Sequence, residues 1–157
     1  MITLVFRWKP LLVSILISLG VGGLSSLFTM GSAELYQSLN QPPLAPPPIL
    51  FPIVWTILYI LMGISAYLIF ESQSFLKKRA LTLYGVQLLF NTLWSLFFFT
   101  LQWYWFAFFW LVILFILVLA MIISFYQINK TAALLQLPYL FWLLFAGYLN
   151  FMIALNN

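Results

Sequence analysis

Polar residues and prolines interrupt this chain at four places and leave five long apolar runs between them. Each run is close to the roughly 20 apolar residues that a helix needs to cross a bilayer. None shows the two-residue alternation of a transmembrane strand. The pattern predicts an all-α membrane protein, a single domain over residues 1–157 built as a five-transmembrane-helix bundle. The expected spans cover about 10–30, 51–70, 80–101, 105–126 and 133–154.

The composition supports lipid as the solvent of this chain. Hydrophobic residues make up 66% of the sequence and charged residues only 5%, whereas a soluble domain has about 25% charged residues. The first 20 residues resemble a secretory signal peptide, because basic residues precede an apolar run. No small-residue cleavage site follows them, so we interpret this segment as a transmembrane helix that is retained.

The basic residues are sorted along the chain in a way that predicts its orientation. With five spans, the N-terminus, the 71–80 loop and the 127–132 turn lie on one side of the membrane. Basic residues mark the cytoplasmic side, so we expect a cell membrane protein with these segments in the cytoplasm and the C-terminus outside. So few basic residues, placed at membrane ends, do not predict a nucleic-acid partner. All six fall in those segments: Arg7, Lys9, Lys77, Lys78, Arg79 and Lys130.

The residues needed for conventional catalysis are absent from the sequence. It contains no His and no Cys, and its only acidic side chains are Glu34 and Glu71. Disulfides, thiol chemistry, Cys/His metal sites and Ser-His-Asp catalysis are therefore excluded. A site made of the two carboxylates is improbable because they are far apart in the sequence.

A proline-rich segment, LNQPPLAPPPILFPIVW, joins the first two spans. Proline fixes φ and reduces the entropy that a loop loses when it packs down. The segment is either a rigid lid over the bundle or a solvated spacer. The lid is favoured by apolar residues that would need burial: Leu39, Leu44, Ile49, Leu50 and Phe51.

Polar residues inside the spans indicate either helix contacts or a ligand pocket, because they are costly in lipid. Gln87 and Asn91 share one helix face in the third span, and Asn150 shares a face with Trp142 and Ala146 in the fifth. Hydrogen bonding between helices is slightly favoured for Asn150, and the two interpretations remain open for Asn91. Small residues in the first two spans, Gly22 and Gly63 among them, are expected to let helices approach closely.

Aromatic residues make up 20% of the chain. The aromatic fourth span, which includes Trp110, is expected to face lipid and the membrane interface. Trp55, Trp94 and Trp142 differ from these, because small or polar residues flank each of them. Rings around a cavity would suit a flat, apolar ligand.

Three blocks of the sequence resemble the TspO/MBR family, also known as the translocator protein, tryptophan-rich sensory protein or peripheral benzodiazepine receptor family. LYQSLNQPPLAPPPILFPIVWTILYILMG is similar to the family pattern WY..L.KP.W.PP...F..VW..LY..MG. QLLFNTLWSLFFF is similar to Q..LN..WS..FF, and PYLFWLLFAGYLNFMIALN to PY..W..FA..LN....LN. Their order and spacing extend the resemblance over nearly the whole chain.

The resemblance implies a five-helix bundle, usually a homodimer in membrane lipid, with a cavity under the first loop for porphyrin or haem and no other cofactor. It implies a sensor, regulator or transporter that binds tetrapyrroles. The alternatives are light-dependent porphyrin degradation through Trp55 and Trp142, and a structural or interaction protein with a vestigial pocket. The implied ligand-binding residues are Tyr36, Pro46, Pro47, Trp55, Tyr59, Asn91, Trp94, Trp142, Ala146 and Asn150.

The chain departs from the family pattern at a few positions. Leu35 and Leu44 replace two loop tryptophans, and Trp110 replaces an acidic residue early in the fourth span. The C-terminus, NFMIALNN, lacks the basic residue of the family's cholesterol-recognition pattern. Sterol binding is therefore not expected.

Overall fold

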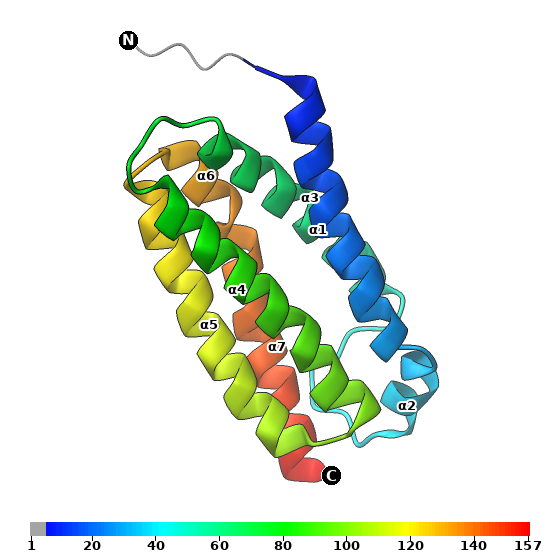
Figure 1. Cartoon of the computed structure of the whole chain (residues 1–157). Coiled ribbons are helices and arrows are strands. Elements are labelled where there is room, and N and C mark those ends of the chain that lie inside the picture. The colour runs from blue at the N-terminus through cyan, green and yellow to red at the C-terminus, as the bar shows by residue number, and fades with distance from the viewer. Residues whose placement is uncertain (1–5) are drawn as a thin grey trace.

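A computed structural model describes residues 6–157, and all regular structure in that part of the chain is helical (Figure 1). Five segments are long and apolar enough to cross a membrane, which confirms the predicted five-helix bundle. They are α1 (Trp8–Phe28), α3 (Leu50–Phe70), α4 (Lys77–Ser95) with the π-helix η1 (Leu96–Thr100), α5 (Tyr104–Tyr126), and α6 (Lys130–Leu135) followed by α7 (Leu137–Asn156). The short helix α2 (Ser32–Ser38) lies between α1 and α3.

The fifth span is broken where the sequence predicts a continuous helix. Gln136 separates α6 from α7, and Pro138 occupies the first turn of α7. Proline has no N–H to donate into a preceding turn, so it starts a helix more readily than it continues one. Asn129 begins the segment, since its side chain accepts a hydrogen bond from Ala132 N at 3.1 Å.

Close contact between α1 and α3 depends on small residues, as predicted for Gly63. A Cβ at Gly63 would lie 2.6 Å from the Cα of Ile15. Ser14 Oγ donates to Gly63 O (2.7 Å), and Ser18 Oγ donates to Tyr59 O (2.6 Å). These bonds satisfy both serines within the bundle, where lipid offers no partner.

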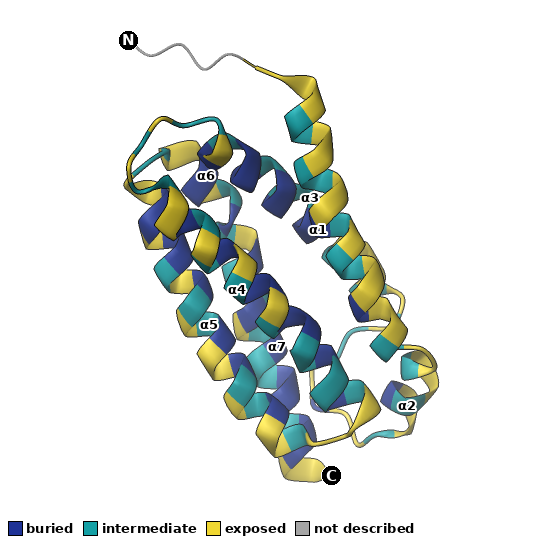
Figure 2. Ribbon diagram, in the orientation of Figure 1, coloured by how far each residue is buried: buried dark blue, intermediate teal, exposed yellow. Residues whose placement is uncertain are grey.

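Exposed residues follow the outer faces of the helices (Figure 2), and many of them are large apolar side chains. Only a small part of α1 is buried within the protein, and α5 is the most apolar of the five spans. Lipid can cover such a surface and water cannot. The chain is a multi-pass membrane protein.

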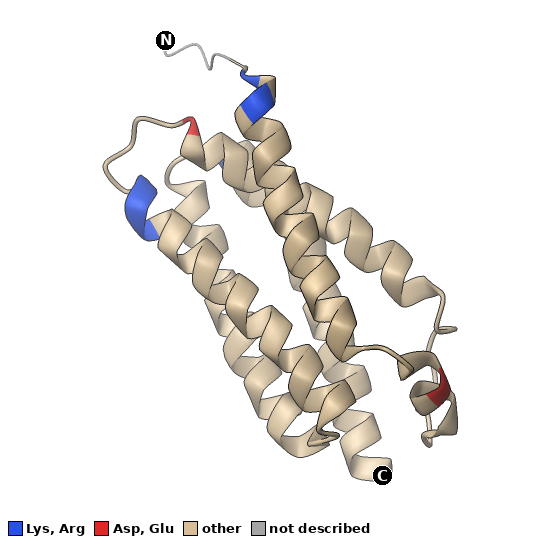
Figure 3. Ribbon diagram, turned by 45° about the vertical axis from the view of Figure 1, so that its right-hand side comes forward, with Lys and Arg blue, Asp and Glu red and all other residues tan. Residues whose placement is uncertain are grey.

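All six basic residues lie near one end of the bundle (Figure 3). The Arg7 guanidinium forms an ion pair with the Glu71 carboxylate at 2.7 Å, and this carboxylate raises the pKa of Arg7 above its ordinary value. Glu34 lies on α2, at the opposite end. This distribution is the one on which the predicted orientation depends.

Candidate functional site

A cavity of about 800 Å³ lies between the helices near the α2 end. Helices α1, α2, α3, α4, η1 and α7 and the proline-rich loop all contribute to its wall, while α5 contributes no residue. The volume lies within the roughly 300–1,000 Å³ of typical small-molecule sites. The wall is mainly apolar, and none of its residues is Lys, Arg, Asp or Glu.

Nine of the ten residues that the family resemblance implies line this one cavity. Pro46 is the tenth, and it does not line the cavity. Its carbonyl instead accepts a hydrogen bond from Tyr36 Oη at 2.8 Å, so Pro46 holds the loop to α2. The neighbouring prolines, Pro47 and Pro48, do line the cavity. The nine are Tyr36, Pro47, Trp55, Tyr59, Asn91, Trp94, Trp142, Ala146 and Asn150.

Aromatic rings from α3 and α7 form one wall of the cavity. The Trp55 ring stacks on Tyr59 with centroids 5.6 Å apart and meets Trp142 edge to face at 6.5 Å. Phe51 also meets Trp142 edge to face, at 6.0 Å. Each ring is thus oriented by a neighbouring ring, and edge-to-face contacts of this kind are favourable.

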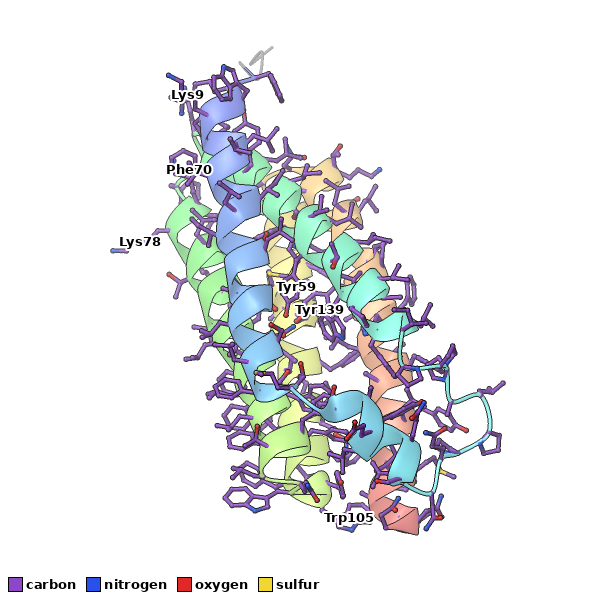
Figure 4. The ribbon with its side chains drawn as sticks, turned by 90° about the vertical axis from the view of Figure 1, so that its right-hand side faces the viewer. Lys9, Tyr59, Phe70, Lys78, Trp105 and Tyr139 are labelled. Carbon is purple, nitrogen blue, oxygen red and sulfur yellow. The ribbon has the colours of Figure 1, made fainter. Side chains whose placement is uncertain are left out.

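A chain of buried hydrogen bonds joins three helices below these rings. Tyr59 Oη donates to Asn91 Oδ1 (2.7 Å), and Asn91 Nδ2 donates to Tyr139 Oη (2.8 Å). Tyr139 Oη in turn donates to Gln87 Oε1 (2.7 Å). Figure 4 shows Tyr59 and Tyr139 close together in the middle of the bundle. Asn91 therefore joins helices, which confirms the first interpretation. It also lines the cavity, and its contact with a ligand stays a prediction.

Asn150 on α7 also lines the cavity and forms hydrogen bonds to other helices. Its Oδ1 accepts from Trp94 Nε1 (3.1 Å), and its Nδ2 donates to Tyr104 O (2.9 Å). The first bond fixes the Trp94 indole, which also stacks on Phe98 with centroids 5.1 Å apart. The hydrogen bonding predicted for Asn150 is confirmed, and it positions a cavity ring.

The indole of Trp142 differs from that of Trp94 in its hydrogen bonding. Its Nε1 is buried and has no partner among residues 6–157. Buried donors are normally paired, because leaving one unpaired costs roughly 1–3 kcal/mol. The indole ring lines the cavity, while its N–H is buried in the packing around it.

The proline-rich loop is tied to α2 and to the end of α7. Tyr148 Oη on α7 donates to Pro43 O at 2.7 Å. The backbone N–H of Asn40 donates to Asn157 Oδ1 at 3.1 Å. Burial raises the pKa of Tyr36, which keeps its hydroxyl protonated and able to donate to the loop.

Two of the loop's apolar side chains are not buried, contrary to the prediction. Leu44 is 81% exposed and Ile49 is 68% exposed. Leu44 has a φ of 70° at a turn, a conformation that is uncommon for a non-glycine residue. The membrane surface can accept apolar side chains that water would not, so their burial within the protein is not required.

Several cavity residues escaped the sequence analysis. Phe98 and Phe99 belong to η1, and Phe51 lies in the first turn of α3. The π-helix has no recognisable signal within the FFF run. Tyr139 does not line the cavity, but it belongs to the hydrogen-bond chain beside it. It lies three residues before Trp142 in the third block, and that spacing on one helix face could have revealed it.

Comparison with known sequences decides the family. The sequence profile of the TspO/MBR family matches residues 14–155. The chain belongs to the TspO/MBR family. It is 40% identical over 148 residues to the tryptophan-rich protein TspO of Archaeoglobus fulgidus, with 94% of this chain and 96% of that protein covered. It is 36% identical to the tryptophan-rich sensory protein of Cereibacter sphaeroides (75% and 73% covered) and 36% identical to the translocator protein of Bos taurus (96% and 91% covered).

The positions where this TspO/MBR chain departs from the family pattern lie outside the cavity wall. Leu35 is half-buried and Leu44 is exposed, and neither lines the cavity. Trp110 was expected to face lipid, but it is half-buried between α5 and α4. Its ring stacks on Phe90 at 4.2 Å, and its Nε1 donates to Phe90 O at 2.9 Å. Like Leu35 and Leu44, Trp110 does not line the cavity.

Proposed function

We propose that this protein binds a tetrapyrrole in the cavity and acts as a membrane sensor, regulator or transporter. The observation that carries this proposal is the set of indole rings, Trp55, Trp94 and Trp142, around one cavity of about 800 Å³. Flat rings that are held in place by neighbours suit a flat, apolar ligand. The names of the relatives, sensory protein and translocator protein, support sensing or transport.

The proline-rich loop is the lid of this site in the proposal. Pro47 and Pro48 contribute to the cavity wall, and hydrogen bonds tie the loop to α2 and α7. Breaking those bonds would let the loop move without disturbing the spans. A ligand could then enter from the end of the bundle opposite the basic residues.

The test is a titration of the purified protein with protoporphyrin IX in the dark, in which the quenching of tryptophan fluorescence measures binding. Ala146→Phe adds a ring inside the cavity, while Leu155→Phe adds the same ring at an exposed position of the same helix. We expect at least about a tenfold loss of affinity in the first variant, equivalent to about 1.4 kcal/mol, and little change in the second. Equal affinity of both variants would place the ligand elsewhere.

Light-dependent degradation of the ligand is the alternative function. Trp55 and Trp142 both line the cavity and contact each other, and the wall has no carboxylate, His or Cys for acid–base chemistry. Illumination of the same complex distinguishes the two functions. Loss of the porphyrin spectrum with a new product supports degradation, and an unchanged spectrum supports binding alone.

A further inference from the structure

We infer that the cavity selects the metal-free macrocycle over haem. This inference rests on the proposed function, because it concerns which tetrapyrrole the same cavity accepts. Iron in haem is held by an axial ligand from the protein, which is His, Cys, Met or Tyr. The cavity wall can be examined for each of these donors.

Imidazole, thiolate and thioether donors do not line the cavity. The sequence contains no His and no Cys. It has five Met, and none of the four that the structure describes lines the wall. Met62 and Met121 are fully buried elsewhere in the core, and Met30 is 80% exposed.

Tyrosine is the only donor type of this set on the wall, at Tyr36 and Tyr59. A tyrosine binds iron as the phenolate, so its hydroxyl must give up its proton. Tyr59 Oη donates that proton to Asn91 Oδ1, and Tyr36 Oη donates to Pro46 O. Binding iron would break a bond that supports the cavity floor or one that holds the loop. Burial also raises the pKa of Tyr36 and disfavours its phenolate.

The charge of the metal is also uncompensated in this cavity. Iron(III) gives the porphyrin core a net positive charge, whereas the metal-free core is neutral. Neither of the chain's two acidic side chains, Glu34 and Glu71, lines the wall. An unpaired charge in an apolar site is costly.

Two ligands that differ only in the metal provide the test: protoporphyrin IX and its iron(III) complex. Both carry the same ring and the same carboxylates, so nonspecific binding contributes similarly to both. The ratio of their dissociation constants therefore reports the effect of the metal. We expect iron(III) protoporphyrin to bind at least about tenfold more weakly. Its absorption and electron paramagnetic resonance spectra should show no ligand from the protein.

Adding a donor should reverse the preference. Leu149→His places an imidazole of similar volume on the α7 wall, and Ala146→His is a second position on the same face. Leu155→His is the matched control on the exposed end of α7. We expect a shifted haem spectrum and at least about tenfold tighter haem binding in one of the cavity variants, with no change in the control.

Three outcomes would overturn the inference. A wild-type haem spectrum with an axial ligand from the protein would show that the wall supplies a donor. Equal affinity of the wild type for the two rings would show that the metal does not matter. If neither ring binds, the proposed function is wrong, and the inferred selectivity, which depends on that function, is wrong as well.

Discussion

Trp142→Phe tests whether the α7 face holds the ligand. The indole meets Trp55 and Phe51 edge to face, and its Nε1 is a buried donor without a partner in residues 6–157. Phenylalanine keeps most of the apolar area, so the free energy of unfolding should fall by less than about 1.5 kcal/mol. The lost N–H removes an unpaired buried donor, so stability should not suffer from its absence.

Ligand affinity should fall because the ring that lines the cavity becomes smaller. A smaller ring weakens stacking by about 0.5–1.5 kcal/mol, which corresponds to roughly a 2- to 10-fold loss of affinity. Quenching of tryptophan fluorescence by protoporphyrin IX in detergent measures the dissociation constant.

Two tryptophan variants control for the loss of a fluorophore. Trp105→Phe changes an exposed ring near the end of the bundle opposite Lys9 and Lys78 (Figure 4). Trp110→Phe removes the hydrogen bond to Phe90 O between α5 and α4, outside the cavity. Neither should change affinity, although the second should lower stability by about 0.5–1.5 kcal/mol. If Trp142→Phe binds like the wild type while Trp110→Phe loses affinity, the assignment of the cavity face is wrong.

Three further changes test the orientation, the packing and the loop. Ser74→Cys and Ser38→Cys should react with an impermeant thiol reagent from opposite sides of the membrane, and the absence of native Cys removes background labelling. Reaction of both cysteines from the same side would contradict the predicted orientation. Gly63→Ala puts a Cβ 2.6 Å from the backbone of α1 and should lower stability by about 1–3 kcal/mol in a detergent unfolding assay, whereas Gly85→Ala meets nothing within 4 Å and should change it little. Tyr148→Phe removes a bond to the loop and should speed porphyrin dissociation by roughly 2- to 10-fold in stopped-flow measurements; an unchanged rate would mean that the loop does not limit release.

The sequence predicted those features that depend on one helix at a time. The length of an apolar run decides whether a helix can span, so the five spans could be identified. The four-residue steps from Trp142 to Ala146 to Asn150 put these residues on one face, and the structure places all three in the cavity wall. The family pattern was needed to state that this face lines a cavity.

Features that depend on contacts between different elements could not be predicted from the sequence. The exposed positions of Leu44 and Ile49 follow from the path of the loop and from a surface that lipid can cover. The π-helix shifts the register of the chain before Phe98, and this turns residues of an apolar run toward the cavity. The half-buried position of Trp110 depends on a carbonyl of another helix.

The buried hydrogen-bond chain determines which cavity residues can report on ligand binding. Removing the Asn91 amide would leave the Tyr59 hydroxyl without its acceptor, at a cost of roughly 1–3 kcal/mol. Tyr139 would lose one donor and keep its bond to Gln87. The resulting loss of affinity would reflect a disturbed floor as much as a lost contact. The Trp142 side chain takes part in no hydrogen bond within residues 6–157, so a change there alters the ligand's surroundings and leaves the hydrogen bonds between helices in place.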